Sequence, residues 1–381
     1  MIKILLTGDN HIGRRYEGRT EKLSKARIDV LTDIVALANQ EHCDLLVVAG
    51  DLFDRDYSIS KNSIIRPVTE AFGQFSGKVL VLPGNHDYYT EDSKLWRDFQ
   101  EEADAFGNIL LLNRFEPYDI GEPENPVIVY PAFCQSKHSE SNNLQWIKDA
   151  QMPEDAACRI GIAHGAIEGL SLDKEGKYFL MTRDELESIP VDAWLIGHTH
   201  MPYPPDLSCE NYREDTRIFN AGTHVQTDVH CNSEGNVFLI EIDNVSGTKK
   251  TVRCKRQVVG KLRFYRETVV LYGDNDQTDL LEKTLTQRTE KIPDFSSVDI
   301  ILKGTVSQEE YQQRETIYRR VLGRFLEHTV DDSALSGLIT VDMIRRRYSE
   351  ISFPAKLLES LLDEPKEVQL LYDLLEDYKD K

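Results

Sequence analysis

Metal-capable side chains recur in this sequence directly after short apolar runs that predict strands. They stand in the motifs DNH, GD, GNH, HG and GHTH. The carboxyl ends of strands in an open α/β sheet border a common crevice, so we expect these side chains to converge although they lie far apart in the chain. The set consists of Asp9, His11, Asp51, Asn85, His164, His198 and His200.

This mixture of carboxylate, imidazole and amide donors favours Mn, Fe or Zn over Mg or Ca, which prefer all-oxygen ligands. We expect Mn²⁺. Seven donors exceed the needs of one ion but suit two divalent ions about 3.5–4 Å apart, the arrangement that clamps a phosphate. Asp51 is the natural bridge between them. Any one of these histidines alone would be an ordinary core or surface residue, whereas the shared position after strands predicts a phosphoesterase site.

The elements that must position these residues predict a layered α/β fold. Residues 21–41 have the apolar spacing of a crossover helix. Residues 216–223 and 236–243 predict further strands and a second sheet. The main strands are unbroken apolar runs, as expected for strands buried on both faces, at residues 2–8, 44–50, 78–84, 108–113, 127–133, 159–165 and 193–200.

The character of the sequence changes twice along the chain. We expect a core domain over residues 1–245, a small α+β domain over 246–306 and a helical region over 307–381. The last region opens with the capping-box spacing of Ser307 and Glu310.

Composition and charge limit the function classes. The chain has 381 residues, of which 40% are hydrophobic and 29% charged, and no apolar run approaches the roughly 18 residues of a membrane span. The first strand leads directly from Met1 to Asp9 and leaves no room for a signal peptide. Six cysteines without CxxC spacing predict reduced thiols, so we expect a cytoplasmic protein without a membrane partner. A net charge of −20 restricts any nucleic-acid contact to local basic patches.

Two basic segments are candidates for contact with nucleic acid, and a solvated charged face is the alternative for each. The first follows His11 and holds Arg14, Arg15, Arg19, Lys22, Lys25 and Arg27. The second, residues 249–266, contains no acid and holds Lys249, Lys250, Arg253, Lys255, Arg256, Lys261, Arg263 and Arg266.

The five motifs together closely resemble those of the calcineurin-like metallophosphoesterases: DxH, GDxx(D/H), GNH(D/E), a lone histidine at a strand end, and GHxH. The resemblance implies a two-sheet metallophosphoesterase core, a ββ sandwich flanked by helices, with residues 246–306 as a capping domain. It implies one metal on Asp9, His11, Asp51 and His200, and a second on Asp51, Asn85, His164 and His198.

Within that superfamily the sequence looks most like the SbcD-type DNA repair exonucleases and the related meiotic-recombination nucleases. The likeness covers about residues 1–245. It implies DNA as substrate, a coiled-coil ATPase of the SbcC kind as partner, and it allows a homodimer. Residues 335–381 are the candidate docking element, with an apolar stripe in the last predicted helix; packing on the chain's own capping domain is the alternative.

Three other functions stay open. The phrase GDLFDR also fits protein Ser/Thr phosphatases, although GNHD in place of GNHE, the GHTH ending and the appended domain favour a nuclease. Small phosphodiesters are another substrate class. A scaffolding role, with the metals needed for assembly, is a third.

Two residues beside the ligands are candidates for catalysis. With Asn85 as ligand, the imidazole of His86 can face the substrate, to protonate the leaving oxygen or stabilise charge in the transition state. Asp54 is predicted to hydrogen-bond His86 and to favour its protonated form. The alternative for His86 is structural support of the ligands.

Overall fold

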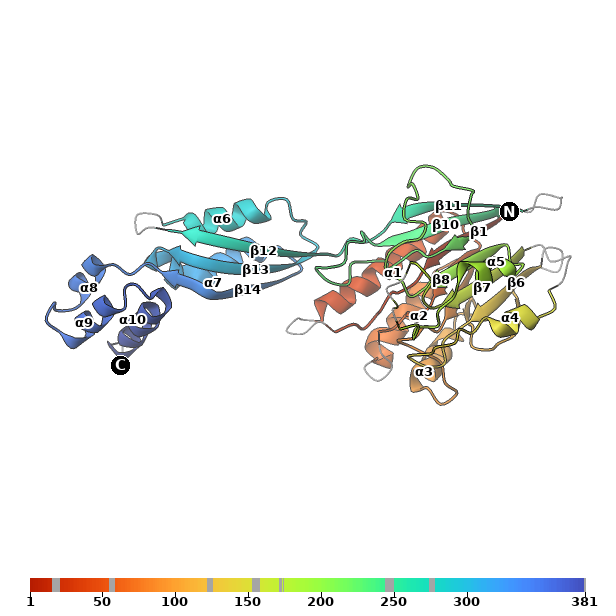
Figure 1. The fold of residues 1–381 in the computed structure, drawn as a ribbon, viewed down its shortest axis with the longest axis horizontal. Helices are drawn as coiled ribbons and strands as arrows, with labels where there is room; N and C mark the ends of the chain where they lie inside the picture. The colour runs from red at the N-terminus through yellow and green to blue at the C-terminus, as the bar shows by residue number, and fades with distance from the viewer. Residues whose placement is uncertain are drawn as a thin grey trace. The chain divides into compact units, whose positions relative to one another are not determined.

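The computed structural model describes residues 1–15, 21–54, 59–121, 126–152, 158–170, 173, 175–243, 250–273 and 278–379. Contacts within the chain divide it into two units, Met1–Leu262 and Arg263–Lys381 (Figure 1). Among the described helices, none is long and apolar enough to cross a membrane.

The first unit contains a six-stranded sheet in the order β11-β10-β1-β2-β3-β4. Four strands run parallel, as their unbroken apolar sequences predict. The other two extend the sheet beyond β1 in antiparallel pairs. The bounds are β1 Ile2–Thr7, β2 Leu45–Ala49, β3 Lys78–Leu82, β4 Ile109–Leu111, β10 Asn236–Asp243 and β11 Thr251–Val258.

A second sheet, of five strands, has the order β5-β6-β7-β8-β9. Only the pair β5 and β6 is antiparallel within it. Its strands are β5 Tyr118–Asp119, β6 Val127–Ala132, β7 Cys158–His164, β8 Ala193–Gly197 and β9 Ile218–Phe219.

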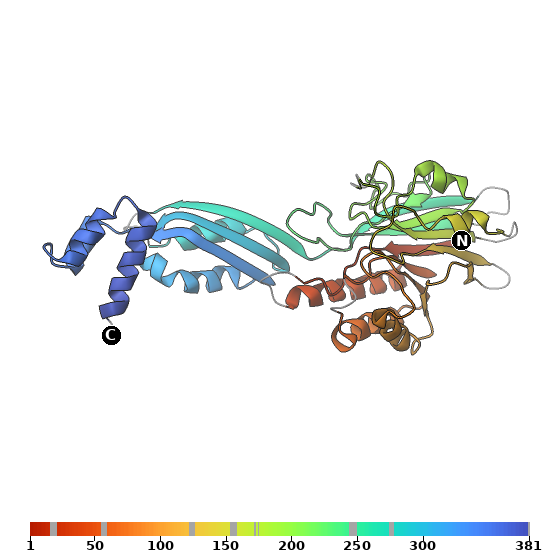
Figure 2. The same cartoon turned by 60° about the horizontal axis from the view of Figure 1, so that its bottom comes forward.

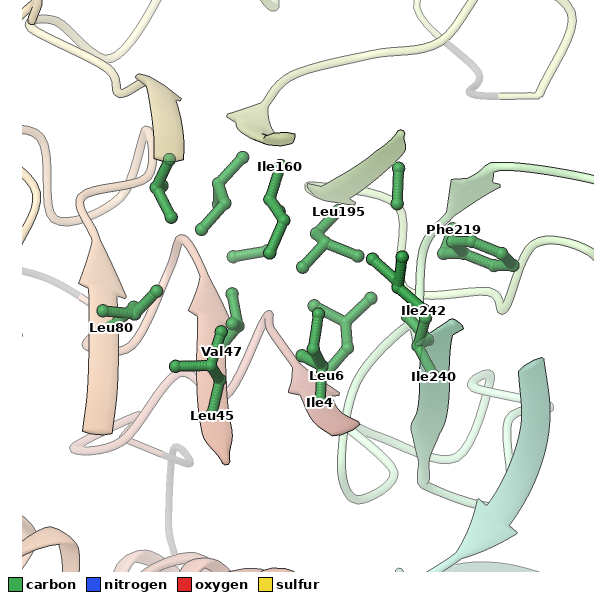
Figure 3. Packing of buried hydrophobic residues seen from close by; sticks show 14 of the residues in the cluster. Ile4, Leu6, Leu45, Val47, Leu80, Ile160, Leu195, Phe219, Ile240 and Ile242 are labelled. Carbon is green, nitrogen blue, oxygen red and sulfur yellow. The ribbon is translucent and has the colours of Figure 1, made fainter. Parts of the chain in front are cut away.

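The two sheets pack face to face around one apolar core (Figure 3). Leu6 and Val47 of the first sheet point toward Ile160 and Leu195 of the second, and all four are fully buried. Successive strand residues face opposite sides of a sheet, so the neighbouring Leu5 turns to the outer layer.

Helices cover both outer faces of this sandwich. The helices α1 Lys22–Gln40, α2 Arg66–Gly73 and α3 Lys94–Ala103 gather on one side of the first unit (Figure 2). A short π-helix, η2 Lys61–Ile65, leads into α2. The helices α4 Gln145–Asp149 and α5 Arg183–Ser188 pack on the outer face of the second sheet. The predicted α/β sandwich flanked by helices is confirmed.

The second unit is a parallel three-stranded sheet, β12-β13-β14, with two helices on one face. Three further helices follow and share a small core of their own. The bounds are β12 Arg263–Tyr272, α6 Leu280–Thr289, β13 Ser296–Val306, α7 Gln308–Leu322, β14 Glu327–Gly337, α8 Val341–Arg347, α9 Phe353–Ser360 and α10 Pro365–Lys379.

Two segments differ from the expected organisation. The strand β11, which the sequence assigns to a separate domain, belongs to the first unit because all its residues pair with β10. The segment after Ser307, expected to be helical, contains β14, which pairs with β13. Its sequence EHTVDDSALSG is largely polar, because only one edge and part of one face of this strand are covered.

Candidate metal centre

The seven predicted ligands lie at the carboxyl ends of strands from both sheets. Three of the strands, β1, β2 and β3, are neighbours in the first sheet, and the other two, β7 and β8, are neighbours in the second. The strand β2 contacts both β7 and β8. The structure therefore brings together Asp9, His11, Asp51, Asn85, His164, His198 and His200.

Four of these residues have a strained backbone. The φ angles are +48° at Asp9, +45° at His11, +50° at Asp51 and +107° at His198. Residues with a Cβ rarely adopt this left-handed region, which costs roughly 1–2 kcal/mol each. The strain is found at strand ends that carry polar side chains, which is typical of a functional site.

Asp9, His11 and His200 form the first group, since they offer ligand atoms within 4.8 Å of one another. The Nε2 atoms of His11 and His200 face each other at 3.0 Å. Burial lowers the pKa of His11, and burial lowers the pKa of His200 to about 4. Both rings are therefore neutral at pH 7, which is the form that binds a metal.

Asn85, His164 and His198 form the second group. His164 donates Nδ1–H to the carbonyl oxygen of Ala49 at 2.9 Å, which leaves Nε2 as its ligand atom, 3.0 Å from Asn85 Oδ1. The Asn85 amide donates Nδ2–H to the carbonyl of Lys137 at 3.3 Å, so that Oδ1 turns inward. His198 Nδ1 lies 3.2 Å from the same oxygen.

Asp51 lies between the two groups. Its Oδ2 is 3.5 Å from His164 Nε2 and 3.8 Å from His11 Nε2. Burial alone would raise the pKa of Asp51, but its attraction to His164 holds that pKa well below the usual range. A buried carboxylate shared by both groups is what a bridging ligand requires.

The donor chemistry of the site fits divalent ions. Nε2 of His164 and Oδ1 of Asn85 both present lone pairs when His164 is neutral, yet they are only 3.0 Å apart. Burial would lower the pKa of His164, but the charge of Asp51 raises it to about 9, so a proton occupies this position when no cation is bound. A divalent ion would replace that proton.

His86 lies beside the ligands and is partly exposed. Its side chain is 35% exposed, and Nδ1 donates to the carbonyl oxygen of Asp54 at 2.9 Å. The Asp54 carboxylate is 3.6 Å from His86 Nδ1 and 3.3 Å from His11 Nδ1. The predicted hydrogen bond between Asp54 and His86 is thus made to the backbone carbonyl of Asp54. The Asp54 carboxylate lies farther from His86 and is also close to His11. Burial would lower the pKa of His86, but Asp54 raises it to about 9.

One residue of the site was not assigned a role from the sequence. Asp87 is fully buried and accepts hydrogen bonds from the backbone N–H groups of Gly84 at 2.7 Å and Phe53 at 2.9 Å. It therefore ties the loop after β2 to the loop after β3. The sequence did point to this residue, because Asp87 is the last residue of the GNHD motif, directly after Asn85 and His86.

The first basic segment is only partly described. Arg14 and Arg15 directly follow the loop of His11, and Arg15 is exposed. Arg14 Nη2 lies 3.8 Å from Asp228. Arg19 lies outside the described residues, as does Arg55, on which the phosphatase alternative depends. Arg27 is buried and is not a surface cation.

Residues 250–258 of the second basic segment, at β11, make ion pairs within the first unit. Lys250 pairs with Asp192 at 2.7 Å and Arg253 with Glu241 at 2.6 Å. Through β10, Arg253 is level with Lys3 at the start of β1, so neither cation lies at the end that carries the ligands.

Two more residues of this segment that were predicted to contact nucleic acid, Lys255 and Arg256, lie beside other side chains of the first unit. Lys255 lies over the ring of Tyr212, 5.1 Å from its centroid. Arg256 lies 3.9 Å from Glu234 and is level with Leu6, nearer the ligand end of the sheet. Lys249 lies outside the described residues. A role in DNA binding stays a prediction for Lys255 and Arg256, whereas the ion pairs of Lys250 and Arg253 favour a structural role for those two cations.

Comparison with known proteins identifies relatives of this chain. Residues 2–202 match the family model described as calcineurin-like phosphoesterase. The uncharacterized metallophosphoesterase YhaO of Bacillus subtilis (strain 168) is 24% identical over 197 residues, which are 51% of this chain and 45% of that protein. The DNA double-strand break repair protein Mre11 of Saccharolobus solfataricus is 30% identical over 123 residues, 32% of this chain and 31% of that protein.

A crystal structure of TT1561 from Thermus thermophilus matches 68% of this chain and 99% of its own, with 12% identity and a TM-score of 0.39. The chain spans less than half the length of each of the two curated relatives.

Proposed function

This chain belongs to the calcineurin-like phosphoesterase family, and from that premise we propose that it is a DNA nuclease that uses two divalent metal ions. Family membership makes it a phosphoester hydrolase. The observation that carries the two-metal proposal is the shared carboxylate of Asp51, 3.5 Å and 3.8 Å from the imidazoles of the two groups.

In this proposal one ion is held by Asp9, His11, Asp51 and His200, and the other by Asp51, Asn85, His164 and His198, with Mn²⁺ as the first choice. When bound, the two ions would supply Lewis acidity toward the phosphate and lower the pKa of a water toward neutrality. The protein's own contribution is to hold the donors in place through further hydrogen bonds on each ligand, such as that of His164 Nδ1–H to the Ala49 carbonyl.

His86 is the residue that acts on the substrate in this proposal. Its Nδ1–H is engaged by the carbonyl of Asp54, so Nε2 is the atom that meets the phosphate or the leaving oxygen. A proton on Nε2 would be donated to the leaving oxygen or would stabilise the charge that develops on the phosphate. The nearby carboxylate of Asp54 favours that protonated form.

The choice of DNA is supported by the similarity to Mre11, a protein named for double-strand break repair, over 32% of this chain. Arg14 and Arg15 follow the ligand loop and are suitably placed to contact a phosphate backbone. The free thiols among the described residues suit a reducing compartment, and we place this activity in the cytoplasm.

We also propose that α10 docks a coiled-coil ATPase. The helix has two apolar sides. Val368 and Tyr372 are buried in the core shared with α8 and α9, whereas Leu370, Leu374 and Tyr378 are 64%, 58% and 81% exposed. The exposed three recur every four residues and therefore form one stripe, which suits a groove on a partner.

One assay separates the competing functions: end-labelled DNA, a nitrophenyl phosphodiester and a phosphopeptide are offered side by side with Mn²⁺ and with Mg²⁺. We expect cleavage of the DNA with Mn²⁺. Preference for the phosphopeptide would assign the chain to phosphatases, and turnover of the nitrophenyl ester alone would assign small phosphodiesters. No turnover of any substrate despite two bound ions would favour the scaffolding role.

A further inference from the structure

Arg27, in the second turn of α1, is a fully buried cation, although it belongs to the first basic segment, which was expected to contact nucleic acid. Its guanidinium makes two hydrogen bonds to one atom, the carbonyl oxygen of Asn10, from Nε at 3.1 Å and from Nη2 at 2.6 Å. Nη1 donates to a second carbonyl, that of Gln226, at 3.2 Å. The side chain therefore joins two loops that are far apart in the sequence.

The first of these loops carries two predicted ligands. Asn10 stands between Asp9 and His11, and both of these neighbours have positive φ angles. Because the left-handed conformation is unfavourable for both, surrounding contacts must hold the peptide between them in place. Arg27 provides two of those contacts through the Asn10 carbonyl, and Asn10 Nδ2 adds a bond to Thr7 Oγ1 at 3.0 Å.

The second loop reaches the third ligand of the same group. Gln226 lies shortly after Thr223, whose backbone N–H donates to the carbonyl of His200 at 3.3 Å. Between them, His224 is buried and donates Nε2–H to the carbonyl of Arg27 itself, at 3.2 Å. Arg27 thus binds this loop through both its side chain and its backbone.

The second group of ligands has other supports. His164 is oriented by the carbonyl of Ala49, and Asn85 by the carbonyl of Lys137. The hydrogen bonds of Arg27 to Asn10, Gln226 and His224 go to the loops of the first group instead. We infer that Arg27 is a positioning residue for the metal held by Asp9, His11 and His200, and that the metal held by Asn85, His164 and His198 is largely independent of it. This inference rests on the proposed two-metal site.

The guanidinium is suited to this role because its fixed fork of donors reaches two carbonyl oxygens at once. A lysine at this position would keep the charge but offers its donors from a single atom, so it can replace only part of the network. A methionine would fill much of the same volume without any donor. The two substitutions therefore separate hydrogen bonding from packing.

The test compares wild type, Arg27→Met, Arg27→Lys and Leu31→Ala in the full chain. Leu31 is fully buried one turn further along α1 and serves as the control for loss of helix packing. Mn²⁺ bound per chain is measured by equilibrium dialysis, and pairing of the ions by the electron paramagnetic resonance signal of coupled Mn²⁺. Thermal unfolding of the metal-free proteins is recorded alongside.

We expect wild type and Leu31→Ala to bind two ions with a coupled signal. Arg27→Met should keep one ion at wild-type affinity and bind the second roughly 10- to 100-fold more weakly, with loss of the coupled signal; Arg27→Lys should be intermediate. If Arg27→Met does not fold, Arg27→Lys provides the test: the inference then requires that Arg27→Lys weaken the binding of one ion and not of the other. Two ions bound at wild-type affinity in the Arg27 variants, or equal weakening of both, would overturn the inference. A wild-type chain that binds only one ion would overturn the two-metal proposal itself and the role of Arg27 with it.

Discussion

His164 turns its Nδ1–H to the carbonyl oxygen of Ala49, 2.9 Å away, and this bond across neighbouring strands of the two sheets fixes which ring nitrogen faces the site. Nε2 is left opposite Asn85 Oδ1 and Asp51 Oδ2, at 3.0 Å and 3.5 Å. The sandwich thus presents a ligand of one sheet with its orientation set by the other.

This geometry predicts different losses for two ligand substitutions. Asp51→Asn should weaken both ions, because Asp51 lies between the two groups, and should lower DNA cleavage by at least about 100-fold. His164→Ala should remove one ion and leave the other. Metal analysis after Mn²⁺ reconstitution checks both. Activity intact with no more than one firmly bound ion in wild type would contradict the dinuclear site.

Two glycines that end strands should respond very differently to alanine. At Gly197 an added Cβ would lie 1.9 Å from the backbone oxygen of Ala49, whereas at Gly8 the nearest atom is 3.5 Å away. Gly197→Ala should therefore cost about 1–3 kcal/mol or more in unfolding free energy, because the neighbouring backbone has to move. Gly8→Ala should be tolerated within about 1 kcal/mol.

Chemical denaturation of the two metal-free variants provides the measurement. Equal stability would mean that the two sheets can separate locally at little cost. The Ala49 carbonyl also binds His164, so Gly197→Ala should in addition weaken the ion held by that histidine.

The strands that bear the site could be predicted from sequence because they are apolar on both faces. The strand β2, with LLVVA buried throughout, shows this well. The strand β14 could not, since its residues are mostly polar and its pairing with β13 is set by the tertiary fold. For the same reason β11, rich in Lys and Arg, looked like part of a separate basic domain although it completes the first sheet.

Within the site, residue type and position after strands were enough to predict the ligands. They were not enough to predict the residues that hold the ligands in place. Asp87 and Arg27 bind backbone groups of loops that are distant in the sequence, so their partners could be known only from the fold, even though Asp87 ends the GNHD motif. Arg27 lies among exposed cations and has the same charge, so its burial could be known only from the fold.

The exposed and the buried cysteines should be alkylated at different rates. Cys209 is exposed, whereas burial raises the pKa of Cys43 to about 12 and that of Cys158 to about 12. With iodoacetamide at pH 8, Cys209 should react rapidly and the two buried thiols only on unfolding, because the thiolate is the nucleophile.

The same shifts predict the sign of the effect on stability. A folded-state thiol pKa above the ordinary value of 9.0 means that the unfolded chain loses protons first. The contribution of these thiols to stability is therefore full below pH 9 and is lost as the pH rises toward 12. Mass spectrometry of labelled peptides and unfolding curves between about pH 8 and 11 check the two statements. Rapid labelling of Cys43 in the folded chain at about pH 8 would contradict both.

The position of the basic residues predicts which of them DNA contacts. Arg14→Ala with Arg15→Ala should lower the slope of log K against log salt by about 0.9 for each lost phosphate contact on duplex DNA. Lys250→Ala with Arg253→Ala should leave that slope unchanged, because these cations pair with Asp192 and Glu241 away from the ligand end. The reverse result would move the DNA path onto β11. Hydrolysis of a nitrophenyl phosphodiester should be unchanged in Lys250→Ala with Arg253→Ala.

The exposed side of α10 predicts a separation of partner binding from folding. Leu370→Asp with Leu374→Asp should abolish co-purification with a coiled-coil ATPase but change the unfolding free energy of the isolated chain by no more than about 0.5 kcal/mol, since both side chains are exposed. Val368→Ala is the matched control, because Val368 is 3% exposed and its truncation should lower stability while leaving the exposed stripe in place.

Deletion of residues 335–381 would be a poorer test of the same idea. It would remove Leu335 and Gly337 of β14, and the Gly337 N–H is bonded to Gln369 of α10 at 2.9 Å. Such a truncation should therefore lower the melting temperature whether or not a partner docks there. A large fall in melting temperature for Leu370→Asp with Leu374→Asp, with the ATPase still bound, would show that the stripe belongs to the chain's own packing. Loss of the ATPase at unchanged melting temperature and unchanged metal-dependent cleavage would assign the stripe to the partner.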